Sequence, residues 1–141
     1  EISICDESLA HAVGELQCLP GQSLFQTPDG HVGSRQVNRF IKEAGDGAFT
    51  AKDFRTWAGT VSAARVLCET EPPTSPTDAK RKIAACCRTV SGLLGNTPTV
   101  CRSSYIHPKV LKRFEAGELA DALPGPDAKS FETRLRLMLA E

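Results

Sequence analysis

Aromatic residues are scarce in this sequence of 141 residues, at 6% of the total, with one Trp and one Tyr. No apolar run approaches the roughly 20 residues that a helix needs to cross a bilayer. The first residues also lack the charged and apolar segments of a secretory signal. We therefore expect a soluble, cytoplasmic protein with no membrane partner. With 40% hydrophobic residues the chain can bury one ordinary core, which predicts a single domain over residues 1–141.

Cofactor and metal motifs are absent as well. There is no G-x-x-x-x-G-K-[ST] loop for ATP and no cluster of carboxylates that would hold two metal ions. The six cysteines form no C-x-x-C pair and have no zinc-ligand spacing, and most of them lie among Ala, Val and Leu. We expect no cofactor, no metal, and free thiols that pack as small buried hydrophobic side chains.

The formal net charge is zero, because Lys plus Arg and Asp plus Glu both number 17, but the charges are unevenly placed. The stretches 1–50, 51–79 and 114–141 are each net negative. Residues 80–113, which we call the basic segment, hold eight bases and no acid: Lys80, Arg81, Lys82, Arg88, Arg102, Lys109, Lys112 and Arg113. A surface that does not bind an anion usually interleaves both signs, so the basic segment predicts a polyanion partner. A solvated helix face is the plainer alternative.

Apolar residues at helical spacing dominate from residue 7 onward and predict a mainly α fold. Residues 1–6 alternate like the end of a strand, and residues 24–26 look like a brief extended piece before a loop at 27–30. The β content is therefore expected to be a short remnant near the N-terminus at most. Helices are expected at 9–16, 34–45, 50–69, 75–95 and 131–139, and in two short stretches that start near 97 and 108, with a looser connection at 119–125.

Local signals define several helix ends. Ser34 can begin one helix, and Thr50–Asp53 has the shape of a capping box at the start of another. Ser75 or Thr77 can begin the long helix, which Gly95 should end. These signals place a polar joint, with Tyr105 inside it, between the two short helices.

Tyr105 and the helix start at Lys52 and Arg55 are the candidates for chemistry. A lone Tyr is more often amphipathic surface or core than a catalyst. Cations around Tyr105 would, however, hold a phosphate diester against the phenol, as nucleophilic catalysis requires. Lys52 and Arg55 are one helical turn apart and can reach a common anion, and the Arg fork can bind two oxygens of one phosphate. Without further context, a solvated helix start would be the better interpretation of Lys52 and Arg55.

The context comes from two separated motifs. Residues 49–60 read FTAKDFRTWAGT, and residues 94–108 read LGNTPTVCRSSYIHP. Together they closely resemble the catalytic domain of bacterial, poxvirus-like type IB DNA topoisomerases, and the similarity covers nearly the whole chain, including residues 19–25 and 37–38. The resemblance implies a helical catalytic-domain fragment of the DNA breaking-rejoining fold, which tyrosine recombinases share.

The resemblance also implies roles for three residues. Tyr105 would attack a DNA phosphodiester to give a 3′-phosphotyrosyl enzyme and a free 5′-hydroxyl. Arg55 would contact the non-bridging oxygens, where charge builds up in the transition state. Asn96 stands where many relatives carry His and can donate the same kind of hydrogen bond. Neither ATP nor a metal is needed, because the energy of the phosphotyrosyl bond reseals the break.

Contacts with double-stranded DNA are expected from Lys52, Arg102, Lys80, Lys82 and His107. The family pattern also contains a second Arg and a general-acid Lys on a β-hairpin, which would precede the residues seen here. We therefore expect this chain to be the C-terminal portion of a longer, monomeric catalytic domain, weak or inactive alone, that acts at a bacterial nucleoid.

Three alternatives stay open. A tyrosine recombinase or integrase fragment shares the nucleophile and fold, but such enzymes usually show His-x-x-Arg and Leu-Gly-His where this chain has Lys52-Asp53-Phe54-Arg55 and Leu94-Gly95-Asn96. A non-catalytic DNA-binding module could preserve the fold alone. A helical interaction domain could use its basic segment to bind an acidic protein.

Overall fold

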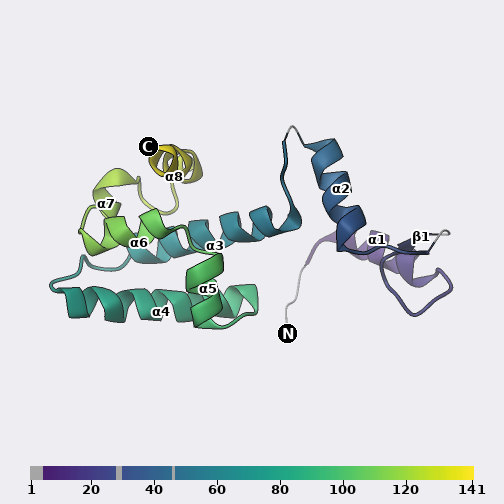
Figure 1. The fold of residues 1–141 in the computed structure, drawn as a ribbon, viewed down its shortest axis with the longest axis horizontal. Helices are drawn as coiled ribbons and strands as arrows, with labels where there is room; N and C mark the ends of the chain where they lie inside the picture. The colour runs from purple at the N-terminus through teal and green to yellow at the C-terminus, as the bar shows by residue number, and fades with distance from the viewer. Residues whose placement is uncertain (1–4, 28–29, 46) are drawn as a thin grey trace. The chain divides into compact units, whose positions relative to one another are not determined.

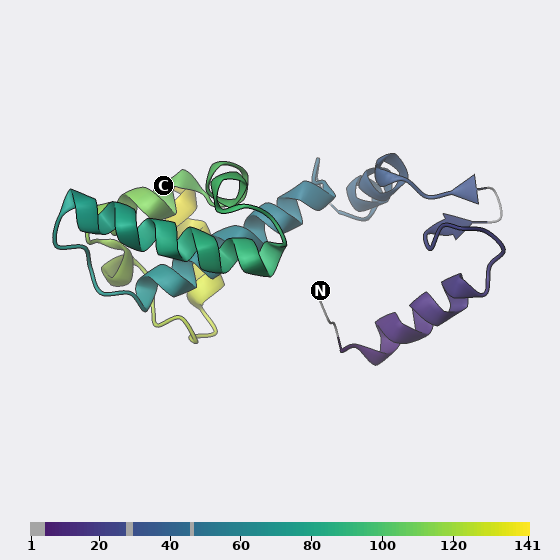
Figure 2. The same ribbon diagram turned by 90° about the horizontal axis from the view of Figure 1, so that it is seen from below.

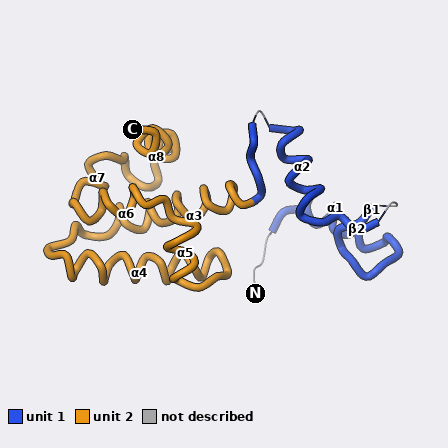
Figure 3. Tube along the Cα trace, viewed as in Figure 1, with its two compact units in different colours: residues 1–51 blue, residues 52–141 orange. Residues whose placement is uncertain are grey.

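The computed structural model describes residues 5–27, 30–45 and 47–141, and its helices and strands are labelled in Figure 1. The chain divides into two compact units, residues 1–51 and 52–141, shown in different colours in Figure 3. The expectation of a single domain stays a prediction. Within the described residues, no helix is both long and apolar enough to span a membrane.

The first unit contains two helices and a small hairpin. Helix α1 covers Glu7–Gln17 and α2 covers Ser34–Ala44, and neither has a buried residue. Strands β1 (Gln26–Thr27) and β2 (Gly30–His31) pair antiparallel, with Gln26 opposite His31. The mainly α prediction with a minor β element near the N-terminus is thus confirmed, although the extended piece expected at 24–26 is shifted and its partner strand was not foreseen.

Two local expectations in this unit are corrected. Asp6, expected in a strand remnant, is instead the N-cap of α1, where its Oδ1 accepts the N–H of Leu9 at 2.8 Å. The rest of that remnant, residues 1–4, lies outside the described residues. Helix α2 is capped by Gly33 rather than by Ser34, because the Gln36 side chain accepts the Gly33 N–H at 3.2 Å.

The second unit is a bundle of helices (Figure 1, Figure 2). It is formed by α3 (Ala51–Cys68), α4 (Pro76–Leu94), α5 (Pro98–Ser104), α6 (Pro108–Glu115), α7 (Leu119–Ala122) and α8 (Phe131–Ala140). Ser75 caps α4 by accepting the Asp78 N–H at 3.1 Å, and Gly95 ends it in the left-handed conformation at φ 64°. The expected ends of the long helix are therefore confirmed, with Ser75 rather than Thr77 as the cap.

The connection expected to be loose at 119–125 contains the short helix α7. Leu119, the first residue of this helix, and Leu123, which directly follows its last residue, are buried, so they tie the segment to the core. An isolated helix of one turn is unstable in water, which is why the sequence pattern alone did not predict it.

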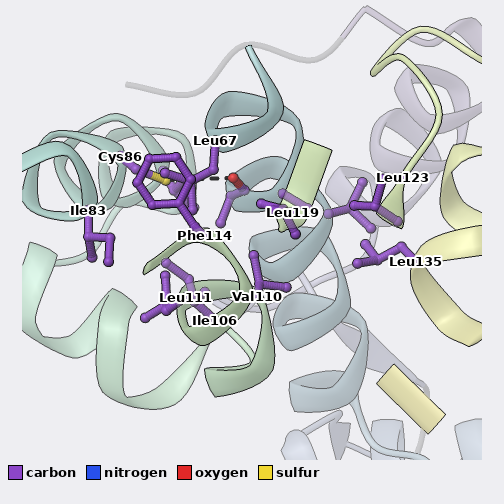
Figure 4. Packing of buried hydrophobic residues seen from close by; sticks show 14 of the residues in the cluster. Leu67, Ile83, Cys86, Ile106, Val110, Leu111, Phe114, Leu119, Leu123 and Leu135 are labelled. Carbon is purple, nitrogen blue, oxygen red and sulfur yellow. Dashed lines mark hydrogen bonds between the residues drawn. The ribbon is translucent and has the colours of Figure 1, made fainter. Parts of the chain in front are cut away.

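The hydrophobic core belongs to the second unit. Figure 4 shows part of it, with side chains from several helices gathered together. Side chains with no exposed surface come from α3, α4, α5, α6 and α8: Ala63, Ala64, Ile83, Val90, Cys101, Val110, Phe131 and Leu135. Helix α4 contacts α3 through side chains, and the Cys86 thiol lies 3.7 Å from the Ala63 carbonyl oxygen.

The cysteine expectation is confirmed for part of the set. All six thiols are free; Cys86, Cys87 and Cys101 are buried, whereas Cys5 and Cys18 are exposed. Burial raises the pKa of the Cys86 thiol to about 12, so this group stays protonated at neutral pH. The buried thiols therefore serve packing rather than nucleophilic chemistry.

Helix α8 is fastened to the bundle by both apolar and charged contacts. Phe131 is fully buried, and the Arg65 guanidinium lies 5.5 Å from its ring centroid. The Glu132 carboxylate accepts hydrogen bonds from Arg65 at 3.2 Å and from the Trp57 indole at 3.4 Å. At the other end of α8, the Lys109 ammonium donates to the Met138 carbonyl at 3.3 Å.

Replacing Phe131 by Ala tests the contribution of this helix. Deleting a fully buried ring leaves a cavity, so we expect the free energy of unfolding to fall by about 3–5 kcal/mol. Urea unfolding followed by circular dichroism measures it. The matched control is Leu137→Ala, an exposed position on the same helix, for which a loss below about 1 kcal/mol is expected. Equal losses in the two variants would show that α8 does not contribute to the core.

Candidate functional site

The candidate site lies where the end of α4 meets the first half of α3. The two helices run antiparallel, because Cys86 contacts Ala63 and Leu94 contacts Arg55 (Figure 1, Figure 2). Beyond α4, the Asn96 N–H donates to the Ser91 carbonyl at 3.0 Å, which closes the turn that Gly95 begins. The packing of α3 on α4 thus brings the motif at residues 94–108 against the motif at residues 49–60.

Arg55 connects the parts of this site. Its Nη2 donates a hydrogen bond to the Leu94 carbonyl oxygen, and its Cζ lies 5.1 Å from the centroid of the Tyr105 ring. A guanidinium at this distance over an aromatic face is attracted by the ring quadrupole. Arg55 and Tyr105 are 50 positions apart in sequence, so only the tertiary fold brings them together.

Tyr105 is held by its main chain at the end of α5. Its N–H donates to the Cys101 carbonyl at 3.0 Å, and the Cys101 side chain is fully buried. The Tyr105 side chain is half-buried, with the Arg55 guanidinium over its ring. The arrangement fixes the backbone of Tyr105 in the core while part of the side chain reaches solvent.

Among the described residues, Asn96 alone has buried side-chain polar atoms without a hydrogen-bond partner. Both Oδ1 and Nδ2 are buried, and neither is bonded to any of the described residues. Leaving a buried polar group unpaired costs about 1–3 kcal/mol. Native structures rarely contain such groups without a reason, and an unused donor two residues after Leu94, which Arg55 contacts, fits a group kept for an external ligand.

Gly59 and Thr60 also belong to this site, and the sequence did not single them out. The Thr60 hydroxyl lies 3.3 Å from the Tyr105 carbonyl oxygen and 3.1 Å from the His107 nitrogen. A Cβ on Gly59 would lie 2.5 Å from that same carbonyl oxygen. The available signal was a glycine in the middle of a helix, which is unfavourable unless packing requires it.

The basic segment is less free than its composition indicated. The Lys82 ammonium lies 2.8 Å from an Asp78 oxygen and also donates to the carbonyls of Glu71 and Pro72, and its side chain is mostly buried. Arg81 pairs with the same carboxylate at 2.6 Å. Asp78 lies just outside residues 80–113, so a count by segment missed the acid that pairs with both of these bases.

Two further bases of this segment stabilise the fold. Lys109 donates to the end of α8, and Arg113 pairs with Glu118 at 3.7 Å and with Glu141 at 3.3 Å. The remaining four bases are exposed and have no ion pair or hydrogen bond with other described side chains: Lys80, Arg88, Arg102 and Lys112. These four exposed bases can bind an anion without first breaking a contact within the protein.

The other expected DNA contacts are unevenly placed. Arg102 lies on α5, three residues before Tyr105, and Lys52 is exposed one turn before Arg55. The Arg55 guanidinium contacts the Leu94 carbonyl, and a common anion for Lys52 and Arg55 stays a prediction. Lys80 lies at the other end of α4 from Leu94, about 20 Å away along the helix axis.

His107 has a structural role as the N-cap of α6. Its Nδ1 accepts the N–H of Lys109 at 3.2 Å, and the residue is exposed. The expected contacts with DNA stay predictions for all five residues: Lys52, Lys80, Lys82, Arg102 and His107.

A comparison with protein families identifies the chain. Residues 8–121 match the family model described as eukaryotic DNA topoisomerase I, catalytic core. The chain therefore belongs to the type IB DNA topoisomerase family, and the matched stretch includes Arg55, Asn96 and Tyr105. A search of curated proteins found no match. Helix α8 follows the matched residues.

Asp78→Asn tests how charge is used at the start of α4. Hydrogen bonds from Lys82 and then from Arg81 hold the pKa of Asp78 well below its ordinary value of about 4. The stabilisation is therefore complete above about pH 4 and is lost as the pH falls from there toward the folded-state pKa. We expect Asp78→Asn to lower the Tm at neutral pH, with a difference from wild type that shrinks below about pH 4.

Thermal unfolding at a series of pH values measures this difference. Asp127→Asn, at an exposed loop position, is the control and should leave the Tm unchanged throughout. A gap between Asp78→Asn and wild type that stays constant down to about pH 3 would contradict the charged role of Asp78.

Proposed function

We propose that this chain provides the nucleophile and two of the phosphate-binding groups of a DNA topoisomerase that relaxes supercoils by transient cleavage of one strand. The observation that carries the proposal is the contact of Arg55 with both the Tyr105 ring and the Leu94 carbonyl, two residues before Asn96. Family membership supports the class of reaction, and the contacts of Arg55 support the choice of Tyr105 and Arg55 as the reacting and phosphate-binding residues.

In the proposed reaction, the Tyr105 phenol oxygen attacks a backbone phosphorus atom. A bond forms between that oxygen and phosphorus and the bond to the 5′-oxygen breaks. The phenol proton passes to water, and the leaving 5′-oxygen takes up a proton from water or from the general acid that the full-length protein is expected to supply. The products are a 3′-phosphotyrosyl linkage and a free 5′-hydroxyl. Attack by that hydroxyl reverses every step, so the strand is resealed without ATP.

Arg55 is proposed to neutralise the non-bridging oxygens of the attacked phosphate. The guanidinium carries several N–H donors in one plane, and the Leu94 carbonyl uses one of them. The others can form a two-pronged contact with a phosphate, which Lys could not reproduce. The Leu94 contact would keep the fork near the Tyr105 ring before DNA arrives.

Asn96 is proposed to add a neutral donor to the same phosphate. Its amide is unpaired and already desolvated, so once DNA binding opens the enclosed site, a hydrogen bond to a developing negative charge would not have to replace an existing one. An amide does not titrate, so this contribution would not vary with pH in the neutral range. We also propose that the chain belongs to the bacterial, poxvirus-like enzymes of this family, on the basis of Asn96 and the two motifs. The proposed location at a bacterial nucleoid depends on that assignment.

The DNA backbone is proposed to lie along the exposed bases nearest the site. Lys52 and Arg102 flank Arg55 and Tyr105 in sequence and are exposed, and Lys80 would meet the duplex farther away. Lys82 is left out of this surface, because a DNA contact would cost its bonds to Asp78, Glu71 and Pro72. Because each neutralised phosphate releases counterions, affinity should fall steeply with salt.

Tyr105→Phe tests the nucleophile in the full-length protein. Without the phenol oxygen no phosphotyrosyl bond can form, so relaxation of a supercoiled plasmid should slow by about 10³-fold or more. Ser103→Ala, on the exposed side of α5, is the control and should relax the plasmid like wild type. Undiminished relaxation by Tyr105→Phe refutes the assignment, and site-specific strand exchange by wild type would favour a recombinase instead.

Asn96→Ala separates catalysis from stability. Removing a transition-state donor should slow single-turnover cleavage of a DNA duplex by about 10²–10³-fold. The Tm should stay the same or rise, because an unpaired buried amide is lost. Asn38→Ala is the contrasting variant, since the Asn38 amide oxygen accepts the Ala51 N–H at 2.9 Å and its loss should cost about 1 kcal/mol. A large drop in Tm with normal cleavage by Asn96→Ala would contradict the proposed role.

A further inference from the structure

Two neighbouring residues of α3, Gly59 and Thr60, lie against the joint between α5 and α6. The joint consists of Tyr105, Ile106 and His107, and both α3 residues are buried. Ile106 inserts its side chain into the core and is 4% exposed, so the joint is anchored on the inner side.

The Thr60 hydroxyl bonds to the main chain on both sides of Ile106. Its oxygen lies 3.1 Å from the His107 nitrogen and 3.3 Å from the Tyr105 carbonyl oxygen. The His107 N–H can only donate, so the hydroxyl oxygen accepts from it. The hydroxyl proton is then free to donate to the Tyr105 carbonyl, which can only accept. Both bonds are satisfied by one rotamer of one side chain that is 2% exposed.

Gly59 permits this close approach. A Cβ at this position would lie 2.5 Å from the Tyr105 carbonyl oxygen, 3.1 Å from Leu94 Cδ1 and 3.2 Å from Tyr105 Cβ. The nearest of these contacts is with main chain, which cannot rotate aside as a side chain can. A glycine inside a helix costs about 0.5–1 kcal/mol relative to Ala, and here the packing of the joint offsets that cost.

We propose that Thr60 is a positioning residue that fixes the main chain of the nucleophile, and that Gly59 provides the space it needs. This inference rests on the proposed function of Tyr105. The Tyr105 side chain is half-exposed, and the Arg55 guanidinium over its ring has to turn toward phosphate in the reaction. The backbone held by Thr60 and Cys101 is then what sets the position of the phenol oxygen.

The test is Thr60→Val in the full-length protein, because Val keeps the shape of Thr and can neither donate nor accept. A displacement of about 1 Å at a reacting group can cost about 10²-fold in rate. We expect the single-turnover rate of covalent adduct formation on a duplex oligonucleotide to fall about 10- to 100-fold. The Kd for the same duplex should stay within about twofold of wild type, because Thr60 is buried and does not meet DNA.

Rescue by the conservative variant distinguishes positioning from packing. Thr60→Ser keeps the hydroxyl and loses a methyl group, so it should form adduct at nearly the wild-type rate. Thr70→Val is the matched control, since it deletes a hydroxyl that bonds to the Val66 carbonyl at 2.7 Å at the far end of α3. It should form adduct like wild type. The inference is overturned by a wild-type rate in Thr60→Val, or by a Thr60→Ser rate as low as that of Thr60→Val.

Gly59→Ala and Tyr105→Phe provide two further tests of the positioning role. If Thr60→Val does not fold, Gly59→Ala should show the same pattern of slow adduct formation with normal DNA affinity, and Thr60→Ser must still react at nearly the wild-type rate. Either failure refutes the positioning role. Tyr105→Phe separates the two proposals. If Tyr105→Phe still forms the covalent adduct, the proposed function fails. If Tyr105→Phe forms no adduct but Thr60→Val forms it at the wild-type rate, the positioning role alone fails.

Discussion

The close approach of α3 to the joint between α5 and α6 is the constraint on which the candidate site depends. Gly59 leaves room for the Tyr105 carbonyl, and Thr60 bonds to the main chain on both sides of Ile106. The same helix carries Arg55 one turn earlier, so the guanidinium reaches the Tyr105 ring and the end of α4. A shift of α3 relative to this joint would therefore separate Tyr105, the proposed nucleophile, from Arg55, the proposed phosphate-binding group.

Local chemistry made much of the helical scaffold predictable from the sequence. Ser75 and Gly95 act within one turn of the ends of α4, so their cap roles follow from the residues themselves. Tyr105 and Arg55 were found as candidates because two motifs resemble a known family, which the match over residues 8–121 supports. Sequence signals of this kind are local, and the helices they define are correspondingly well placed.

Features that depend on distant partners could not be predicted. Thr60 and Tyr105 are 45 positions apart, and nothing in the spacing indicates that a hydroxyl joins them. The Lys82–Asp78 pair, by contrast, is an i,i+4 contact within α4 that the sequence could have shown, and the charge count over residues 80–113 missed it because Asp78 lies just outside that range. Asn96 was expected to be a donor, but its enclosed and unpaired state is visible only in three dimensions. Propensity and composition describe single segments, whereas these contacts depend on how segments pack.

The central claim is that Tyr105 forms the covalent bond with DNA. The most direct measurement traps the covalent complex of the full-length protein on a nicked duplex, digests protein and DNA, and identifies the modified peptide by mass spectrometry. The account predicts a nucleotide joined through its 3′-phosphate to Tyr105, within the tryptic peptide that runs from Ser103 to Lys109. A 3′-phosphate on another residue, a 5′-linkage, or relaxation without any covalent peptide would contradict it.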